Sequence, residues 1–285
     1  MSQLDLTIKP AQTEVVLKPN SIFTQAYDII NNSSESVLLS TSVSPWIPAD
    51  NLGTVSYTDT TINPNFTFSL SNSDLKLNQD FLLSPKQKKQ LVLKINNRNT
   101  QENDHYFTFF ITQKPLNNLN SKQNLAKIGS HILVSTSTQN EQDTNLQITS
   151  TTVTPKIKDI FLPIRINGEI FNNGKHYSQI TGHIVISKNN LVISDQNLFP
   201  YTVTPQNSRL LHCLNSQNEN TPCQINSPIW PGFYQGTITL NNSSSKSEYS
   251  FNFFVFPYIL IVTTIFIFLL LNFLLNHKQS ISSRK

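Results

Sequence analysis

The sequence predicts an all-β protein of two tandem Ig-like antiparallel β-sandwiches followed by a single transmembrane α-helix. Three observations support this fold class. Short runs of alternating polar and apolar residues recur along the chain, separated by clusters of turn-forming Asn, Ser and Gly residues. No stretch before residue 253 shows the apolar periodicity of an amphipathic helix. A charge-free apolar run then extends from Phe253 to Leu275.

The expected strands are recognised by their period of two residues or by β-branched and aromatic content. Asn-rich turns such as Asn31–Ser34 and Asn96–Asn99 separate them, and short strands joined by frequent turns favour antiparallel sandwiches. In chain order the expected strands are Leu4–Ile8, Val37–Val43, Gln90–Ile95, Tyr106–Thr112, His131–Ser135, Ile180–Ile186, Tyr234–Leu240 and Tyr249–Phe254.

A polar, threonine-rich passage from Gln139 to Pro155 divides the two expected sandwiches. It has no sustained apolar face, which is typical of a connector. The predicted domains are therefore a first sandwich at 1–138, a linker at 139–155, a second sandwich at 156–252, a transmembrane helix at 253–275 and a basic cytoplasmic tail at 276–285.

The apolar run predicts one membrane crossing, because a helix of this length spans about 30 Å of hydrocarbon. The tail beyond it carries Lys278, Arg284 and Lys285 and no acid, so the positive-inside rule places it in the cytoplasm. The expected localisation is the cell membrane, single-pass, with the N-terminal domains extracellular. Residues Met1–Leu17 contain no recognisable signal peptide, which leaves open an upstream start, a mature form with a new methionine, or a tail-anchored cytosolic protein.

The charge content argues against a nucleic-acid partner. Of the 285 residues, 21 are basic and 17 acidic, and they are interspersed, which gives a formal net charge of +4 without a basic stripe. Asn and Ser occupy the polar positions instead. The remaining partners are a membrane and other proteins or polymers.

Four short phrases stand out: a proline-closed first strand ending at Pro10, an Asn-Asn-Ser turn at Asn31–Ser33, the segment Asn51–Tyr57 and the turn-and-strand Ser84–Leu91. Together they resemble the N-terminal domain of bacterial WxL-interacting surface proteins. The segment Asn172–Tyr177 is similar to the second sandwich of such proteins. The cysteine pair and the absence of a signal peptide depart from that family. The resemblance implies a non-enzymatic surface protein that engages peptidoglycan and partner surface proteins, and it supplies no binding residue.

Cys213 and Cys223 are the only cysteines, and a polar loop separates them. An even count in an otherwise cysteine-free chain predicts a disulfide and an oxidising exterior. The alternative is two unrelated reduced thiols. A metal site is not expected, because His212 beside Cys213 lacks the ligand spacing of zinc, and no cofactor is indicated.

No enzyme motif is present, so no catalytic residue is predicted. The chain lacks G-x-S-x-G, H-E-x-x-H and phosphate-loop patterns, and it has seven glycines with which to build such loops. A hairpin would allow His176 and His183 to meet, but no third ligand is evident, which favours a surface pair over a metal site. Trp46 and Trp230 stand beside prolines and are expected to pack within the sandwiches.

Two hypotheses follow for function. In the first, a membrane-anchored cell-surface protein presents its Ig-like domains to cell-wall polymer or to partner surface proteins. In the alternative, a tail-anchored cytosolic adaptor uses a chaperone-like β-sandwich to recruit peptides to a membrane. In the first hypothesis, exposed loops or edge-strand pairing would supply the binding surface.

Overall fold

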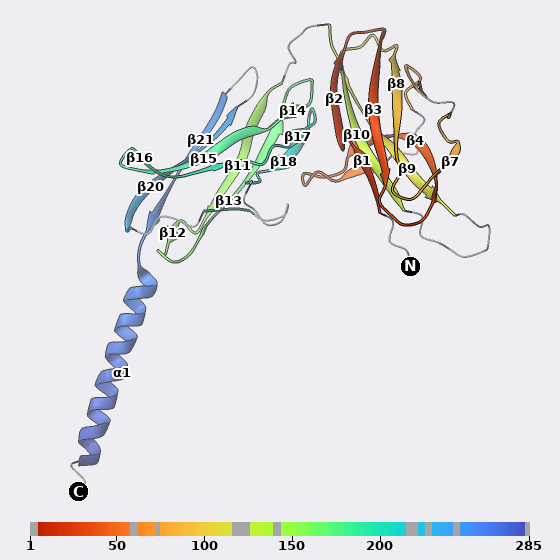
Figure 1. Ribbon diagram of the computed structural model, residues 1–285. Helices are drawn as coiled ribbons and strands as arrows, with labels where there is room; N and C mark the ends of the chain where they lie inside the picture. Colours follow the sequence, from red (N-terminus) through yellow and green to blue (C-terminus); the bar gives the residue numbers. More distant parts are fainter. Residues whose placement is uncertain are drawn as a thin grey trace. The chain divides into compact units, whose positions relative to one another are not determined.

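The computed structural model describes residues 5–57, 62–71, 75–115, 126–138, 144–214, 222–225, 230–241 and 246–282, and the side chains up to 274. Contacts divide the chain into two compact units. Unit 1 is Met1–Thr144 with Gly174–Tyr177, and unit 2 is Asn145–Asn173 with Ser178–Lys285. Figure 1 traces both units and the final helix. The basic tail predicted at 276–285 lies outside the described side chains.

Unit 1 is a two-layered β-sandwich. One sheet has the strand order β1-β3-β8-β6, and the other has β2-β10-β9-β4-β5, with β7 also paired to β4. Apolar residues of both sheets, among them Ile29, Leu93 and Phe109, form one buried core. The strands are β1 (Leu6–Lys9), β2 (Gln12–Leu17), β3 (Ser21–Asn31), β4 (Val37–Pro48), β5 (Val55–Tyr57), β6 (Phe66–Leu70), β7 (Asp80–Leu83), β8 (Lys88–Asn97), β9 (Asp104–Lys114) and β10 (Lys127–Thr136).

The first strands of unit 1 belong to different sheets. β1 pairs antiparallel with β3, whereas β2 pairs parallel with β10, so the chain changes sheet between Lys9 and Gln12. The Lys9–Pro10 peptide bond at this change is cis. The parallel pairing of β2 with β10 joins segments more than a hundred residues apart, and β2 forms one edge of the second sheet.

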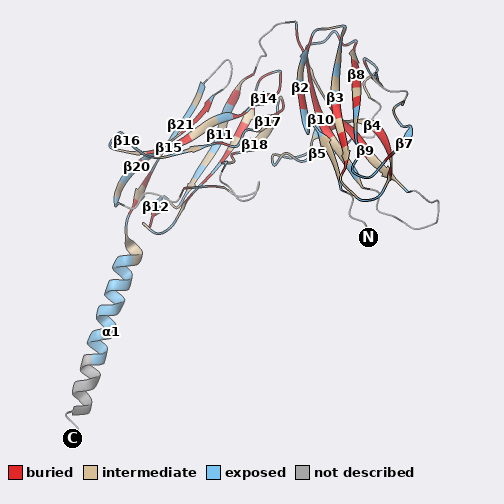
Figure 2. Cartoon of the chain, viewed as in Figure 1, coloured by how far each residue is buried: buried red, intermediate tan, exposed pale blue. Residues whose placement is uncertain are grey.

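Unit 2 is a second sandwich with sheets ordered β11-β13-β18, with β19 on β13, and β12-β21-β20-β15-β16, besides the small pair β14-β17. Its core joins residues such as Ile166, Ile184 and Ile238 from the two large sheets. Figure 2 shows buried residues concentrated on the strands of both units. The strands are β11 (Leu146–Thr154), β12 (Ile157–Lys158), β13 (Ile164–Asn172), β14 (Ser178–Gln179), β15 (Thr181–Lys188), β16 (Leu191–Asn197), β17 (Thr202–Val203), β18 (Ser208–Leu210), β19 (Cys223–Ile225), β20 (Gly232–Asn241) and β21 (Lys246–Val255).

The predicted all-β class and the sandwich architecture are thus confirmed, with two differences in detail. The passage expected as a linker, 139–155, contains strand β11, which pairs along its length with β13. Its threonines alternate between the two faces of the sheet, so a strand forms without a continuous apolar face. Residues 139–143 of that passage lie outside the described part of the chain.

The second difference concerns the apolar run. Its first residues finish β21, where Phe253 and Val255 are buried in the core of unit 2. Helix α1 (Tyr258–Ser282) begins only after Pro257, and its described large apolar side chains from Leu260 to Leu274 are exposed. Over the described part of the chain, no helix has both the length and the apolar character needed to cross a membrane. The prediction of a single span at 253–275, with its cell-membrane localisation and cytoplasmic tail, is therefore corrected.

Candidate binding surface

The candidate surface lies on unit 2, where strand β16 forms one edge of its five-stranded sheet. β16 pairs with β15 on one side, and the described residues supply no strand on the other. The pairing contains a bulge between Ile186 and Ser187, opposite which Ile193 is the extra residue. Bulges of this kind bend and twist an edge strand.

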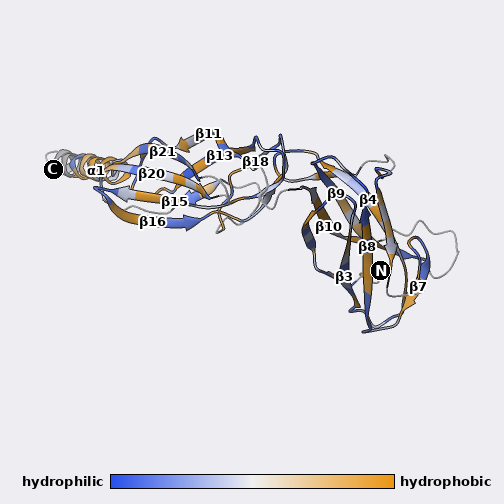
Figure 3. Ribbon diagram, turned by 90° about the horizontal axis from the view of Figure 1, so that it is seen from above, coloured by the Kyte–Doolittle hydropathy of each residue, from blue (hydrophilic) through white to orange (hydrophobic). Residues whose placement is uncertain are grey.

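The first half of β16 is apolar and open to solvent. Leu191, Val192 and Ile193 expose 69%, 64% and 43% of their surface. Figure 3 shows this apolar start and the polar end of the strand. Edge strands normally carry charges or prolines that prevent pairing with other chains, and here the first charge is at Asp195. An exposed apolar edge of this type is a template for another strand.

The hydrogen bonds beside β16 show which backbone groups face outward. The N–H of Leu198 donates to the carbonyl of Gly182 on the β15 side at 2.9 Å. The carbonyl of Asn197 accepts from Leu214 on the opposite side at 3.1 Å. Because these directions alternate along a strand, the N–H and carbonyl of Asp195 also face outward, toward the open edge. The available edge therefore covers residues 191–195.

Two other edges, β11 and β2, are more polar. β11 exposes Gln147, Ser150 and Thr152 along the border of the opposite sheet. β2 in unit 1 exposes Gln12 and Glu14, with Val16 as its one exposed apolar residue. β16 therefore differs from both edges in having three consecutive exposed apolar side chains.

The turn that begins β16 is a tight hairpin. Asn189 and Asn190 have φ values of 51° and 64°, and two consecutive residues in the left-handed region are typical of a two-residue turn whose twist matches the strands. Asparagine tolerates this conformation better than most residues do. The Asn-Asn pair thus fixes where β16 starts and which residues reach the edge.

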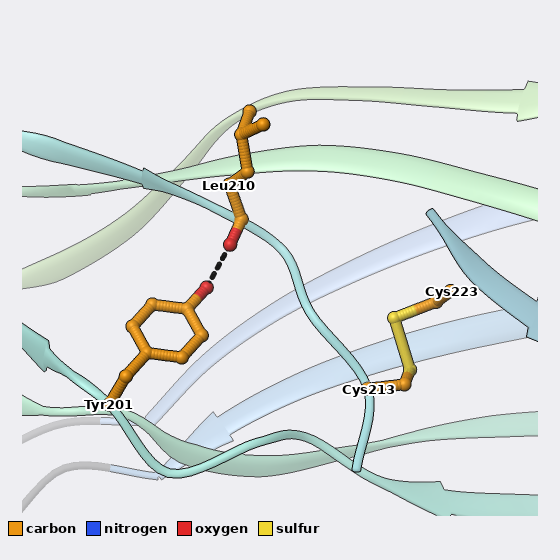
Figure 4. Close-up of a disulfide and its surroundings, with 4 residues drawn as sticks. All are labelled: Tyr201, Leu210, Cys213 and Cys223. Carbon is orange, nitrogen blue, oxygen red and sulfur yellow. Dashed lines mark hydrogen bonds between the residues drawn. A yellow bond between two sulfur atoms is a disulfide. The ribbon is translucent and has the colours of Figure 1, made fainter. Parts of the chain in front are cut away.

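The predicted disulfide lies close to the end of the same strand. Cys213 and Cys223 are bonded, and both are buried in the core of unit 2 (Figure 4). Cys213 forms an isolated bridge with Leu198, the residue after β16, while Cys223 belongs to β19. Nearby, the hydroxyl of Tyr201 donates to the carbonyl of Leu210, and burial raises the pKa of this phenol. The disulfide therefore ties the exit of β16 to the opposite sheet.

His176 and His183 belong to different units. His176 lies in unit 1, where its Nδ1 is 2.8 Å from Asp104 Oδ1 and 2.7 Å from Ser135 Oγ. His183 lies on β15 of unit 2, 3.8 Å from Asp195. Within the described residues, no group of three or more His, Cys, Asp or Glu side chains is placed to hold a metal ion. Trp46 is buried as predicted, but Trp230 is 76% exposed, which contradicts its expected packing.

Comparison with known proteins gives matches in structure alone. No family model matches the sequence, and no curated protein matches it. A chaperone–tip adhesin complex of CFA/I fimbriae biogenesis is similar with a TM-score of 0.43 and 12% identity, over 89% of this chain and 99% of that chain. The class 5 fimbriae chaperone CfaA is similar with a TM-score of 0.41 and 13% identity, over 89% of this chain and 100% of that chain. The structure of the Salmonella enterica SafA pilin with the SafB chaperone has a TM-score of 0.41 and 12% identity, over 88% of this chain and 98% of that chain.

These comparisons correct the predicted family. The similar structures named above are of fimbrial chaperones, whereas the sequence phrases pointed to WxL-interacting surface proteins. Those phrases are turn residues that many sandwiches share, which is the physical reason that they misled. The predicted function of presenting domains to cell-wall polymer from a membrane anchor, with peptidoglycan as a partner, is corrected with them.

Proposed function

We propose that this protein binds an extended segment of a partner protein along the open edge of β16, and that it does so without catalysing a reaction. Each unit is further proposed to be an Ig-like sandwich. The proposal keeps the chaperone-like half of the alternative hypothesis, a β-sandwich that recruits peptides, and drops the tail anchor. The single observation that carries it is the unpaired edge at residues 191–195, with its exposed apolar side chains at 191–193.

Strand addition explains why this edge is apolar. A partner strand would complete hydrogen bonds with the outward backbone groups of β16, which contribute affinity independent of the partner's sequence. Its side chains would cover Leu191, Val192 and Ile193, and burial of such side chains contributes about 25 cal/mol per Å². The partner chemistry is therefore an extended segment of about five residues that carries apolar side chains.

Two of the similar structures are complexes of a chaperone, one with a tip adhesin and one with a pilin. We extend to this chain only the general feature, a protein partner. The buried disulfide supports a protein that works in an oxidising compartment, because structural disulfides persist there.

The test uses a fluorescent, lysine-flanked peptide of alternating valine and threonine as the probe. We expect the full chain to bind it, with slower hydrogen exchange at residues 191–195. The double substitution Val192→Lys/Ile193→Lys should abolish binding, because two charges oppose an incoming strand. Thr152→Lys on the polar edge β11 is the matched control and should leave binding intact. Binding that survives the double substitution, or protection confined to another edge, would overturn the proposal.

A further inference from the structure

Unit 2 also contains an open groove at the hairpin end of its five-stranded sheet, distinct from the β16 edge. Its volume is about 490 Å³, and its walls include Ser187, Asn189, Asn190, Phe233, Gln235 and Asn252. These residues come from the β15–β16 hairpin and from strands β20 and β21. The strand register places Ser187, Gln235 and Asn252 in one cross-strand row. Because paired residues share a face, the three side chains point to the same side of the sheet.

The one charged residue of the groove is held against its wall. Lys188 Nζ donates to the carbonyl of Pro231 at 2.8 Å and lies 5.2 Å from the centre of the Tyr234 ring. It passes over Gly232, where a Cβ atom would come within 2.9 Å of the amine and where φ is 140°. The φ value favours a glycine at this position, because residues with a Cβ atom rarely adopt it. The ammonium is thus directed to a backbone carbonyl and a ring face.

The free polar groups of the groove are amides. Asn189, Asn190, Gln235 and Asn252 are exposed, and their side chains make no hydrogen bond to any described residue. Each amide offers a donor and an acceptor side by side. Four such groups around one groove match a ligand whose polar groups also donate and accept, and they offer no counter-charge to an ionic ligand.

An exposed aromatic ring completes the groove. Phe233 is 77% exposed, and its ring is supported from the side by Phe254, with ring centres 4.7 Å apart. The apolar C–H face of a sugar ring covers an aromatic face of this size, while the hydroxyl groups at its rim reach the surrounding amides. A polyproline segment fits less well, because its recognition uses an aromatic-lined groove and only one aromatic ring of this groove is exposed.

We infer that this groove binds a neutral sugar residue, with the ring stacked on Phe233 and the hydroxyl groups bonded to the amides of Asn189, Asn190, Gln235 and Asn252. The site adjoins the strand-binding edge, since Val192 pairs with Ser187, but none of the edge residues 191–195 lines the groove. The ligand class is an uncharged hexose or N-acetylhexosamine. Acidic sugars would bind less well, since Lys188 is already engaged.

The test is saturation-transfer NMR on the full chain with the methyl glycosides of glucose, galactose, mannose and N-acetylglucosamine as probes. We expect transfer to at least one glycoside, and a loss of affinity of about tenfold or more in Phe233→Ala. Trp230→Ala is the matched control, because its side chain is equally exposed and does not line the groove. The Ile193→Lys protein should keep the transfer, because Ile193 does not line the groove, and this separates the site from the proposed strand-binding edge.

Three outcomes would overturn the inference. No transfer to any of the four glycosides is the first. The second is transfer that persists unchanged in Phe233→Ala. The third is tighter binding of a lysine-flanked decaproline peptide at the same residues, which would make the groove a peptide site.

Discussion

Asp159 and Ile259, one hundred residues apart, are joined by a hydrogen bond in unit 2. The backbone N–H of Ile259 in the first turn of α1 donates to Asp159 Oδ2 at 2.8 Å, and Oδ1 accepts from the N–H of Phe161 at 3.0 Å. The carboxylate is fully buried. The first N–H groups of a helix have no partner within it, and a negative charge beside them is favourable. Asp159 therefore caps α1 from a distant segment.

We predict that Asp159→Ala lowers the free energy of unfolding by about 1–2 kcal/mol, the usual cost of losing a helix cap. Asp159→Asn should cost less, because its side-chain carbonyl can still accept one hydrogen bond. Urea unfolding followed by circular dichroism measures both. Wild-type stability in Asp159→Ala would show that the cap contributes nothing.

Trp46 is predicted to be a major contributor to the stability of unit 1. Its Nε1 donates to the carbonyl of Phe107 at 2.9 Å, and its ring stacks on Tyr106 with centres 4.8 Å apart. Trp46→Ala should cost about 3–5 kcal/mol, as for other buried aromatic residues. Trp230→Ala, at an exposed position, should stay within about 0.5 kcal/mol. Similar losses in the two variants by calorimetry would contradict this assignment.

The disulfide is predicted to stabilise unit 2. Closing a loop of this length removes unfolded-chain entropy equivalent to about 3 kcal/mol. Cys213→Ala/Cys223→Ala should lose about that amount, measured by thermal unfolding of the oxidised wild type and the variant. Treatment with a reductant should lower the melting temperature of the wild type and leave that of the variant unchanged. An equal response to reductant in both proteins would mean that the bond is not the cause.

Gly182 is predicted to resist substitution. A Cβ atom at this position would lie 2.0 Å from the backbone oxygen of Thr239 on the neighbouring strand, so β15 and β20 would have to separate. Gly182→Ala should cost about 1–3 kcal/mol. Gly168→Ala is the control, because its nearest atoms would be 3.3 Å away. Equal melting temperatures for the two variants would rule out the predicted clash.

The free energy of unfolding of unit 1 is predicted to decrease as the pH is lowered from 7.5 to 5.5. Burial lowers the pKa of His105 and of His131 below the ordinary 6.5, even though Asp104 acts in the opposite direction on His105. The His131 side chain is hydrogen-bonded to Thr108, and its ring packs on Trp46. The His105 side chain is hydrogen-bonded to Asn99 and Asn103.

The unfolded chain therefore binds more protons than the folded one just below pH 6.5. The contribution of the two neutral histidines to the stability of unit 1 is complete above that pH. It is lost as the pH falls toward the pKa values of the histidines in the folded protein. The fluorescence of Trp46 in a Trp230→Phe background reports unit 1. His105→Gln/His131→Gln should flatten the dependence over this range. The lowered pKa values of the Asp28 and Asp50 carboxyl groups affect the stability only at lower pH, because the ordinary pKa of the group is 3.8. An unchanged slope in the double variant would contradict the assignment.

The amino-acid sequence by itself predicted the all-β class and eight of the strands of this chain. The alternation at Gln90–Ile95 and the aromatic run at Tyr106–Thr112 lie within β8 and β9, because side-chain period is a local property of a strand with one buried face. The two cysteines likewise identified their own bond, since there was no other partner.

The tertiary structure alone decided what the apolar residues do. Phe253 and Leu260 belong to one apolar run, yet the first is buried between sheets and the second is exposed on a helix. The alternating polar residues of β11 looked like a linker until β13 supplied a partner. Which strand lies at an edge depends on pairings between distant segments, and hydropathy along a chain does not encode these. The exposure of β16 and the groove around Phe233 were therefore decided by the folded sheet.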